Sequence, residues 1–300
     1  MKKINEIKEP TYDYITNYLQ NLRDEYPFLH LASCGKSVMG KEILGICMGE
    51  GKRRVMYVGG THANEWITTL FLLRFCQKFC ESVKNKGDVC GFDSKRILSQ
   101  IKFVVIPCLN PDGTDIFIKG VSACGEFKEQ IYDISKFDFS QWSANANGID
   151  LNHNFNADWY ALRDYEEKNN IKKPSPRRFG GAFPESEPET KALTEFLRNV
   201  HFNRLYSFHS QGEEIFYEYG KNTPKKSLFI AKALAGVSGY TLVKNEGHYS
   251  SGGLKDWFIE EFKEPAFTIE IGRGKKPLPL ESFNEIYETV EPLAVMGLML

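Results

Sequence analysis

Residues 54–66 read RVMYVGGTHANEW, and they join the end of a predicted strand to two residue types that bind metals. The apolar run 55–58 predicts a buried strand. His62 and Glu65 follow that strand, three positions apart. A polar pair that caps the following helix would explain the spacing equally well, because a His-x-x-Glu pattern is common by chance. The choice between a cap and half of a metal site depends on the rest of the chain.

Composition excludes several classes of protein. Of 300 residues, 42% are hydrophobic and 26% are charged, which is ordinary for a soluble globular protein. The net charge of -1 gives no sign of a nucleic-acid or acidic-membrane partner. The pairs Lys225-Lys226 and Lys275-Lys276 are too short for a nucleic-acid arm, and we expect them to be solvated. No apolar window approaches 18 residues, so no membrane span is expected.

The N-terminus and the cysteines bear on location. No apolar signal-peptide region follows the two opening lysines, so we expect a cytoplasmic protein. The seven cysteines all lie in the first half of the chain, without a C-x-x-C motif. Their odd number and their placement predict free thiols rather than a disulfide framework.

Hydrophobic patterns predict one α/β domain, because no internal repeat or low-complexity linker divides the chain. Ser186 and Glu189 have capping-box spacing ahead of a further helix. Other helices are expected at 11–26, 63–83, 226–237, 252–261 and from about 281. Strands are expected at 42–48, 54–60, 101–110, 204–210, 240–243 and 265–271. The alternation implies a mixed or mostly parallel sheet covered on both faces.

Three local patterns carry more specific expectations. The segment GEGKRR between the strands 42–48 and 54–60 predicts a hairpin. The sequence NPDG at 110–113 predicts a turn after the strand 101–110. Residues 114–147 are expected to be irregular.

Polar residues fall at the ends of three predicted strands. His62 and Glu65 follow the first, His209 ends the second, and Glu270 lies near the end of the third. In α/β sheets, sites lie beyond the carboxyl ends of the strands. A catalytic zinc needs three His, Asp or Glu ligands and one open position, and a nearby carboxylate then takes a proton from the activated water. Glu270 interrupts the apolar run AFTIEIG, where an unpaired carboxylate is costly to bury. The four residues together favour a catalytic metal site.

Ordered motifs over about residues 36–285 resemble the zinc metallocarboxypeptidases, the carboxypeptidase A-like or funnelin peptidases. The motifs are GKSVMGKEI, GGTHANEWIT, NPDG, GIDLNHNF, FPESEPET, FHSQG, SGGLKDW and FTIEIG. The resemblance implies one Zn²⁺ held by His62, Glu65 and His209, with Glu270 as the general base. It also implies a single zinc peptidase domain over residues 1–300. The implied fold is a mixed, mostly parallel eight-stranded sheet with helices on both faces.

Two positions depart from the digestive members of that family. His153 follows Asn152 where an arginine would clamp the terminal carboxylate of the substrate, and histidine lacks the planar fork of arginine. Ser143 follows Trp142 where another arginine would stabilise the oxyanion. A second electrophile is therefore unassigned.

The segment around SGGLKDW supplies further substrate-binding candidates. A tyrosine normally stands three residues before SGG, but here His248 stands there with Tyr249 beside it, so either is a candidate lid residue. Lys255 resembles the family's side-chain specificity position, where a cation favours an anionic group. A solvated helix lysine is the alternative for Lys255. With Asn152 and His153, these residues are the expected substrate contacts, and Arg273 is a further candidate for holding the substrate.

The combination of HANEW, WSANANGIDLNHNF and HSQGEEI most resembles the bacterial γ-D-glutamyl-L-diamino acid peptidases. Those enzymes cut the γ-D-glutamyl–diaminopimelate bond of peptidoglycan stem peptides, so the resemblance implies a muropeptide substrate. The alternative is a general carboxypeptidase that removes C-terminal residues from peptides, and His153 and Ser143 argue against it. A zinc protein that only binds peptide is a third hypothesis, which Glu270 and the complete ligand set disfavour.

Overall fold

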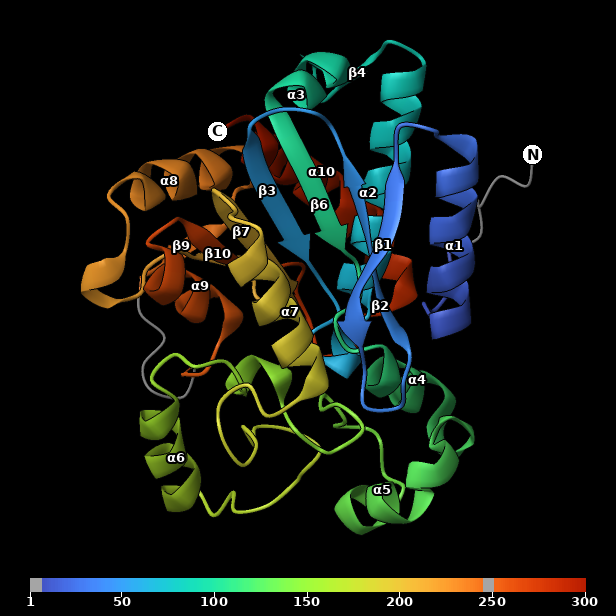
Figure 1. The fold of residues 1–300 in the computed structure, drawn as a ribbon, viewed down its shortest axis with the longest axis vertical. Helices are drawn as coiled ribbons and strands as arrows, with labels where there is room; N and C mark the ends of the chain where they lie inside the picture. The colour runs from blue at the N-terminus through green and yellow to red at the C-terminus, as the bar shows by residue number, and fades with distance from the viewer. Residues whose placement is uncertain (1–6, 245–250) are drawn as a thin grey trace.

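The computed structural model describes residues 7–244 and 251–300. Eight strands within these ranges form one mixed sheet. The strand order is β1-β2-β6-β3-β7-β10-β8-β9, and Figure 1 shows the sheet between layers of helices. The strands are β1 (His30–Lys36), β2 (Glu42–Met48), β3 (Arg53–Val58), β6 (Ile101–Ile106), β7 (Arg204–His209), β8 (Glu214–Phe216), β9 (Thr241–Val243) and β10 (Ala266–Glu270). A separate two-stranded sheet joins β4 (Asp88–Val89) to β5 (Phe92–Asp93).

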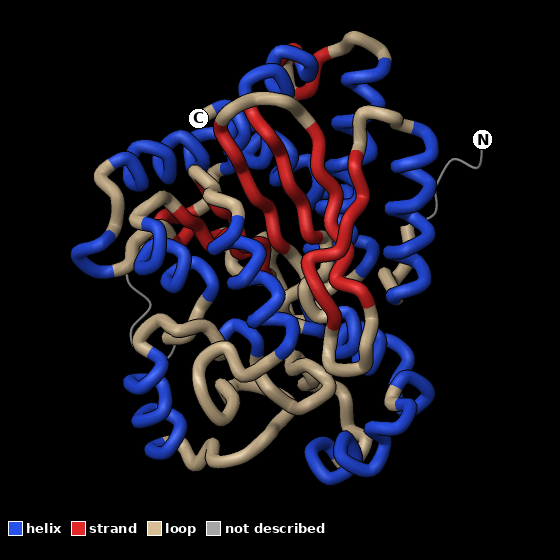
Figure 2. Tube along the Cα trace, viewed as in Figure 1, coloured by secondary structure: helices blue, strands red, loops and turns tan. Residues whose placement is uncertain are grey.

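Helices cover both faces of the large sheet, as expected, and Figure 2 shows them on either side of the strands. They are α1 (Tyr12–Glu25), α2 (Ile67–Lys84), α3 (Ser94–Gln100), α4 (Pro111–Lys119), α5 (Lys128–Ser135), α6 (Trp159–Lys168), α7 (Pro188–Asn199), α8 (Lys226–Ser238), α9 (Leu254–Phe262) and α10 (Phe283–Met299). One core cluster packs α1, α2, α8 and α10 on the sheet, and a second packs α7 and α9 on the other face.

Residues 55–58, the last four of strand β3, are apolar at every position. Val55 and Tyr57 belong to the first core cluster, whereas Met56 and Val58 belong to the second. Successive side chains of a strand point to opposite faces, so the part of a strand that helices cover on both sides is apolar at successive positions.

The four central strands position the functional edge of the sheet. Strands β6, β3, β7 and β10 are parallel neighbours in that order. Their carboxyl ends therefore meet at one edge. Strands β2 and β8 run antiparallel to this group on its two sides.

The expected hairpin between residues 42–48 and 54–60 is wrong. Strand β6 lies between β2 and β3 and pairs with both. The hairpin partner of β2 is β1, which the sequence patterns missed because its side chains are half-buried or exposed. Apolar runs mark strands but do not give their order, and β6 buries both faces by taking the inner position.

The segment after β6 is more helical than expected. NPDG begins helix α4, because the Asn110 side chain accepts a hydrogen bond from the Gly113 amide at 2.9 Å and Pro111 occupies the first turn. Asparagine and proline favour helix starts as well as turns. Helices α4 and α5 thus occupy part of the region 114–147, which was expected to be irregular.

The expected capping box at Ser186 and Glu189 is also wrong. Helix α7 begins at Pro188 after Glu187, without a side-chain cap. The Glu189 carboxylate instead accepts hydrogen bonds from the Val38 amide and the Asn145 side chain, each at 3.1 Å. It connects α7 to two other segments and leaves its own helix end uncapped.

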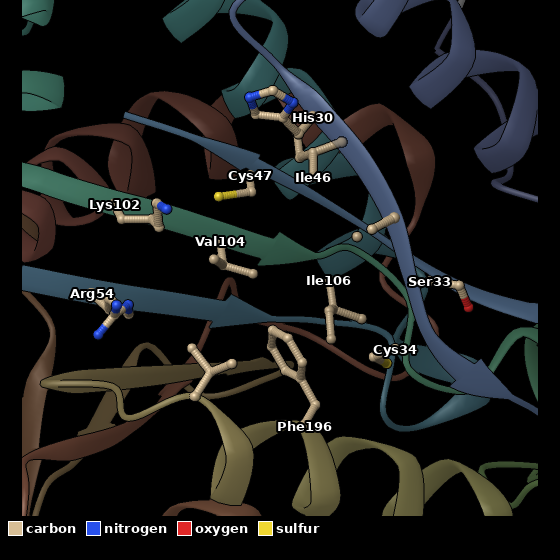
Figure 3. Close-up of a pocket in the computed structure, with 13 residues that line it drawn as sticks. His30, Ser33, Cys34, Ile46, Cys47, Arg54, Lys102, Val104, Ile106 and Phe196 are labelled. Carbon is tan, nitrogen blue, oxygen red and sulfur yellow. The ribbon is translucent and has the colours of Figure 1, made fainter. Parts of the chain in front are cut away.

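The cysteines are free thiols, as expected. Cys34 and Cys47 line an apolar cavity of about 210 Å³ between the β1–β2–β6 surface and α7, where Phe196 lies (Figure 3). Burial raises the pKa of Cys34 to about 12, so this thiol stays protonated at neutral pH. Within residues 7–244 and 251–300, no helix has the length and apolar character that crossing a bilayer requires.

Candidate metal centre

His62, Glu65 and His209 come together at the carboxyl edge of the sheet. His62 precedes a single 3-10 turn, Ala63–Glu65, in the connection after β3, and His209 is the last residue of β7. Their candidate ligand atoms all lie within 4.8 Å of one another. Segments far apart in the sequence thus supply one group of metal-binding side chains.

The contacts inside this group have the character of a metal site. The two Glu65 oxygens contact the Nδ1 atoms of His62 at 2.8 Å and of His209 at 3.0 Å. The two Nδ1 atoms are 3.2 Å apart. Glu65 and His209 are only 2% and 1% exposed, and a buried carboxylate requires a positive partner. Two imidazoles and one carboxylate form a donor set that catalytic zinc accepts.

A glycine turns the chain from β3 into the centre. Gly60 has a φ of +57°, and a Cβ atom there would lie 2.6 Å from Oγ1 of Thr69 and 2.9 Å from the backbone of Cys108. Its amide donates to Oγ1 of Thr68 at 2.9 Å, which ties the turn to the first turn of α2. Only glycine fits this left-handed, crowded position. Gly60 therefore determines the direction in which the chain runs from β3 to His62.

Asp150 and Ser207 orient the two histidines, and the sequence analysis missed both. Nε2 of His62 lies 3.1 Å from Oδ1 of Asp150, and Nε2 of His209 lies 3.0 Å from Oγ of Ser207. Such contacts turn the other ring nitrogen toward the metal position. Ser207 was identifiable in principle, because it is two residues before His209 and thus on the same face of β7.

Carboxylates in the centre favour positive charge on the groups beside them. Burial lowers the pKa of His62, but Glu65 and Asp150 outweigh it and raise that pKa to about 10. Burial raises the pKa of Glu65, but His62, Lys276 and a hydrogen bond from His209 hold it well below its usual value. For His209 burial dominates and lowers the pKa. Glu65 is therefore ionised, and its negative charge is shared among several positive groups.

Lys276 is a further member of this cluster. Its Nζ atom lies 2.5 Å from Oε1 of Glu65. Burial lowers its pKa, but Glu65 and then Glu270 outweigh that effect and raise it. Lys275 and Lys276 are both exposed, as expected, but Lys276 also forms an ion pair with Glu65. Nothing in the local sequence distinguishes the two, because the contact depends on how the segment after β10 folds back.

Glu270 is the last residue of β10 and is half-buried. It is in register with His209 on the neighbouring parallel strand. Residues in register leave the sheet on the same side, so Glu270 adjoins the metal centre. This is the placement that a general base requires, and the role itself stays a prediction.

The expected substrate contacts differ in their surroundings. His153 is half-buried, and its Nδ1 atom has no hydrogen-bond partner among the residues that the structure describes. The Asn152 side-chain oxygen accepts from the Leu254 amide at 3.1 Å, which fixes the start of α9. His248 and Tyr249 lie outside the described residues.

Lys255 is not a solvated helix residue. It is 4% exposed, forms an ion pair with Asp256, and donates to the Glu218 carbonyl at 3.0 Å. The solvated alternative is therefore wrong. A role in substrate specificity stays a prediction, now with a carboxylate beside the cation.

Comparisons with known proteins agree with this geometry. A family model described as zinc carboxypeptidase matches residues 15–292. Gamma-D-glutamyl-L-diamino acid endopeptidase 1 of Lysinibacillus sphaericus is 33% identical over 296 residues, which are 97% of this chain and 73% of that protein.

Solved structures share the fold. Carboxypeptidase A from Helicoverpa armigera superposes with a TM-score of 0.72 and 20% identity, over 98% of this chain and 76% of that one. Murein-tripeptide amidase MpaA from Escherichia coli O157 gives 0.54 and 21%, over 90% of both chains. With the extent of the family match, these findings show that the chain belongs to the zinc carboxypeptidase family and is a zinc metallopeptidase.

Proposed function

We propose that this zinc peptidase hydrolyses the γ-D-glutamyl–diaminopimelate bond of peptidoglycan stem peptides. The observation that carries the proposal is the similarity, over 97% of the chain, to a protein named as a γ-D-glutamyl-L-diamino acid endopeptidase. The residues at the two arginine positions agree with it. Ser143 is buried and neutral, and His153 lacks the fork that binds a simple C-terminal carboxylate.

The residues of the centre have separate roles in this mechanism. His62, Glu65 and His209 would hold the zinc, and Asp150 and Ser207 would keep the two histidines turned toward it. A zinc held there supplies Lewis acidity, which activates water and polarises the scissile carbonyl.

Glu270 is the group that would transfer the proton. As the carboxylate next to His209 in the sheet, it would take a proton from the attacking water and then pass it to the amine of the leaving diaminopimelate. Proton transfer to the amine matters because an amine leaves readily only when it is protonated.

Substrate choice follows from the missing arginine. A plain C-terminal residue would lose a bidentate, charge-assisted contact worth about 1.5–3 kcal/mol. Diaminopimelate offers a second carboxylate and a distal amine, so other groups can hold it. Lys255 and Asp256, which form a buried ion pair, are candidates for this zwitterionic end. Arg178 is a candidate for the carboxylate nearer the cut. Its side chain is exposed, its amide donates to Asp150 at 2.9 Å, and its charge acts on His153.

The test is a comparison of two substrates by the zinc-loaded protein. L-Ala-γ-D-Glu-meso-diaminopimelate and a hippuryl amino acid are each incubated with enzyme, with enzyme plus chelator, and with zinc restored. We expect kcat/KM at least about tenfold higher for the γ-glutamyl peptide, which corresponds to about 1.4 kcal/mol in transition-state binding. Chelator should abolish both activities. Comparable kcat/KM values would refute the proposal and favour a general carboxypeptidase.

A further inference from the structure

Lys276 brings an ammonium group to the metal centre from the segment that follows Glu270 along the chain. It contacts Glu65 directly, and the charges of Glu270 and Asp150 act on it as well. Its side chain is 36% exposed, so solutes reach it. A long, flexible and accessible cation beside the reacting groups is suited to binding an anionic part of a substrate.

Lys276 and Arg178 act on different parts of the site. Arg178 acts on His153, the residue at the position of the family's carboxylate clamp. Lys276 acts on Glu65 and Glu270, the candidate metal ligand and the candidate base. A general base acts where water adds to the acyl carbon of the substrate. Lys276 lies on the segment that follows the candidate base Glu270, so its ammonium is placed to contact the acyl half of the substrate.

Metal binding changes what Lys276 can do. Glu65 as a zinc ligand would share its negative charge with the metal. The attraction between the Lys276 ammonium and Glu65 would then be weaker, so the ammonium could bind another anion. The four-carbon stem of the side chain would let it reach that anion. The family's usual cations are absent at Ser143 and His153, so Lys276 supplies a positive charge that these two positions do not.

The γ-glutamyl linkage offers such an anion. In this linkage the acyl carbon is the side-chain carbonyl of glutamate, so the α-carboxylate stays free, two methylene groups and one α-carbon away from the scissile carbonyl. An ordinary peptide has no free carboxylate there. We propose, building on the function proposed above, that Lys276 binds this α-carboxylate and thereby selects γ-linked glutamyl substrates.

The experiment uses two peptides that differ only at that carboxylate. One is L-Ala-γ-D-Glu-diaminopimelate, and the other carries D-isoglutamine, in which the α-carboxylate is an amide. The parent enzyme should prefer the acid by about tenfold in kcat/KM, as expected for one charge-assisted contact. Lys276→Met should lose most activity on the acid and little on the amide, so that the preference disappears. Lys276→Arg should restore part of it.

A neighbouring lysine provides the matched control. Lys275→Met removes one positive charge from the adjacent position and should keep the preference of the parent enzyme. A second readout does not depend on turnover: isothermal titration with the product L-Ala-γ-D-Glu and with its α-amide. The parent protein should bind the acid more tightly, and Lys276→Met should bind both alike. Zinc content is measured in each variant.

Three outcomes would overturn the inference. If the parent enzyme cleaves and binds the acid and the amide equally well, Lys276 does not bind the α-carboxylate of the γ-glutamyl residue. If Lys276→Met loses zinc and loses both activities in proportion, the lysine only supports Glu65. If neither γ-glutamyl peptide is cleaved while hippuryl substrates are, the proposed function is wrong. The role of Lys276, which depends on that function, is then wrong as well.

Discussion

Glu270 and His209 stand in register on the parallel strands β10 and β7. Ser207, two residues before His209, contacts the same imidazole from the same face of β7. The sheet itself therefore holds the candidate base, one candidate metal ligand and the group that orients it. Sites built on strands or helices are held more precisely than sites on loops, so this part of the site is positioned before substrate arrives.

The first prediction concerns Glu270. Replacement by glutamine keeps the shape of the side chain but removes its basicity, so Glu270→Gln should lower kcat by about 10²–10⁴-fold. Zinc content and melting temperature should stay close to those of the parent. Glu214→Gln, which changes the residue in register on the next strand β8, is the control and should stay active. Near-parental turnover of Glu270→Gln would exclude it as the base.

The second prediction concerns the groups that orient the ligands. Asp150→Asn should weaken zinc binding by about 10–100-fold, because it removes the charge that His62 contacts. Ser207→Ala should have a smaller effect, since its hydroxyl is neutral. Zinc affinity is measured by competition with a chromophoric chelator. His201→Ala, which changes an exposed histidine, is the control. An unchanged zinc affinity in Asp150→Asn would rule out the orienting role.

Short apolar segments were enough to predict at which edge of the sheet the candidate zinc ligands lie. Each segment identified a strand, and the carboxyl ends of parallel strands share one edge. His62, His209 and Glu270 lie close together there because β3, β7 and β10 are also neighbours. Predicting the edge needed only the positions where strands end. The order of the strands was not predicted beyond the pairing of β2 with β3, and that pairing was wrong.

Features that depend on long-range packing were not predictable in this way. Strand β1 is partly exposed, so its apolar pattern is weak. Lys275 and Lys276 look alike in the sequence, and only the fold brings one of them to Glu65. Asp150 lies within the motif GIDLNHNF, yet its contact with His62 spans 88 positions of the chain. Such contacts have no local periodicity from which they could be inferred.

The third prediction tests two glycines. Gly252 has a φ of +85°, and a Cβ there would lie 2.6 Å from the His153 carbonyl oxygen. Its amide donates to the Ala157 carbonyl at 2.7 Å, so the backbone cannot move freely. Gly252→Ala should destabilise the fold by more than about 1 kcal/mol. Gly236 lies in helix α8 with nothing within 4 Å, and Gly236→Ala should stabilise the fold by about 0.5–1 kcal/mol.

Thermal unfolding of both variants measures these effects. The two substitutions add the same methyl group, so any difference in melting temperature reports the backbone and its surroundings. Equal shifts for the two glycines would mean that the close approach of residue 252 to His153 is not tight.

The fourth prediction is a dependence of stability on pH. Burial raises the pKa of Glu189 to about 8, despite hydrogen bonds from the backbone and Asn145 that lower it. The folded state therefore holds a proton that the unfolded state, with a pKa near 4.5, has already released. The stabilising contribution is complete below about pH 4.5 and is lost as pH rises through 8.

Urea unfolding between pH 7 and 8.5 provides the measurement, since ordinary histidines are already neutral there. The free energy of unfolding should fall with pH in the parent, and Glu189→Gln should show a flatter dependence. A parent whose stability rises across this window would contradict the raised pKa.

The last prediction concerns His153. His153→Arg places a guanidinium where the family's clamp stands, near Arg178, whose charge already acts on this position. A terminal carboxylate would then meet a planar fork, so kcat/KM for hippuryl substrates should rise by about tenfold relative to that for the γ-D-glutamyl peptide. His153→Gln keeps a neutral hydrogen-bonding side chain and should leave the ratio near the parental value. If the ratio of the two kcat/KM values is the same in His153→Arg and His153→Gln, the clamp position does not determine specificity. Specificity would then be assigned to the residues that contact the acyl half of the substrate.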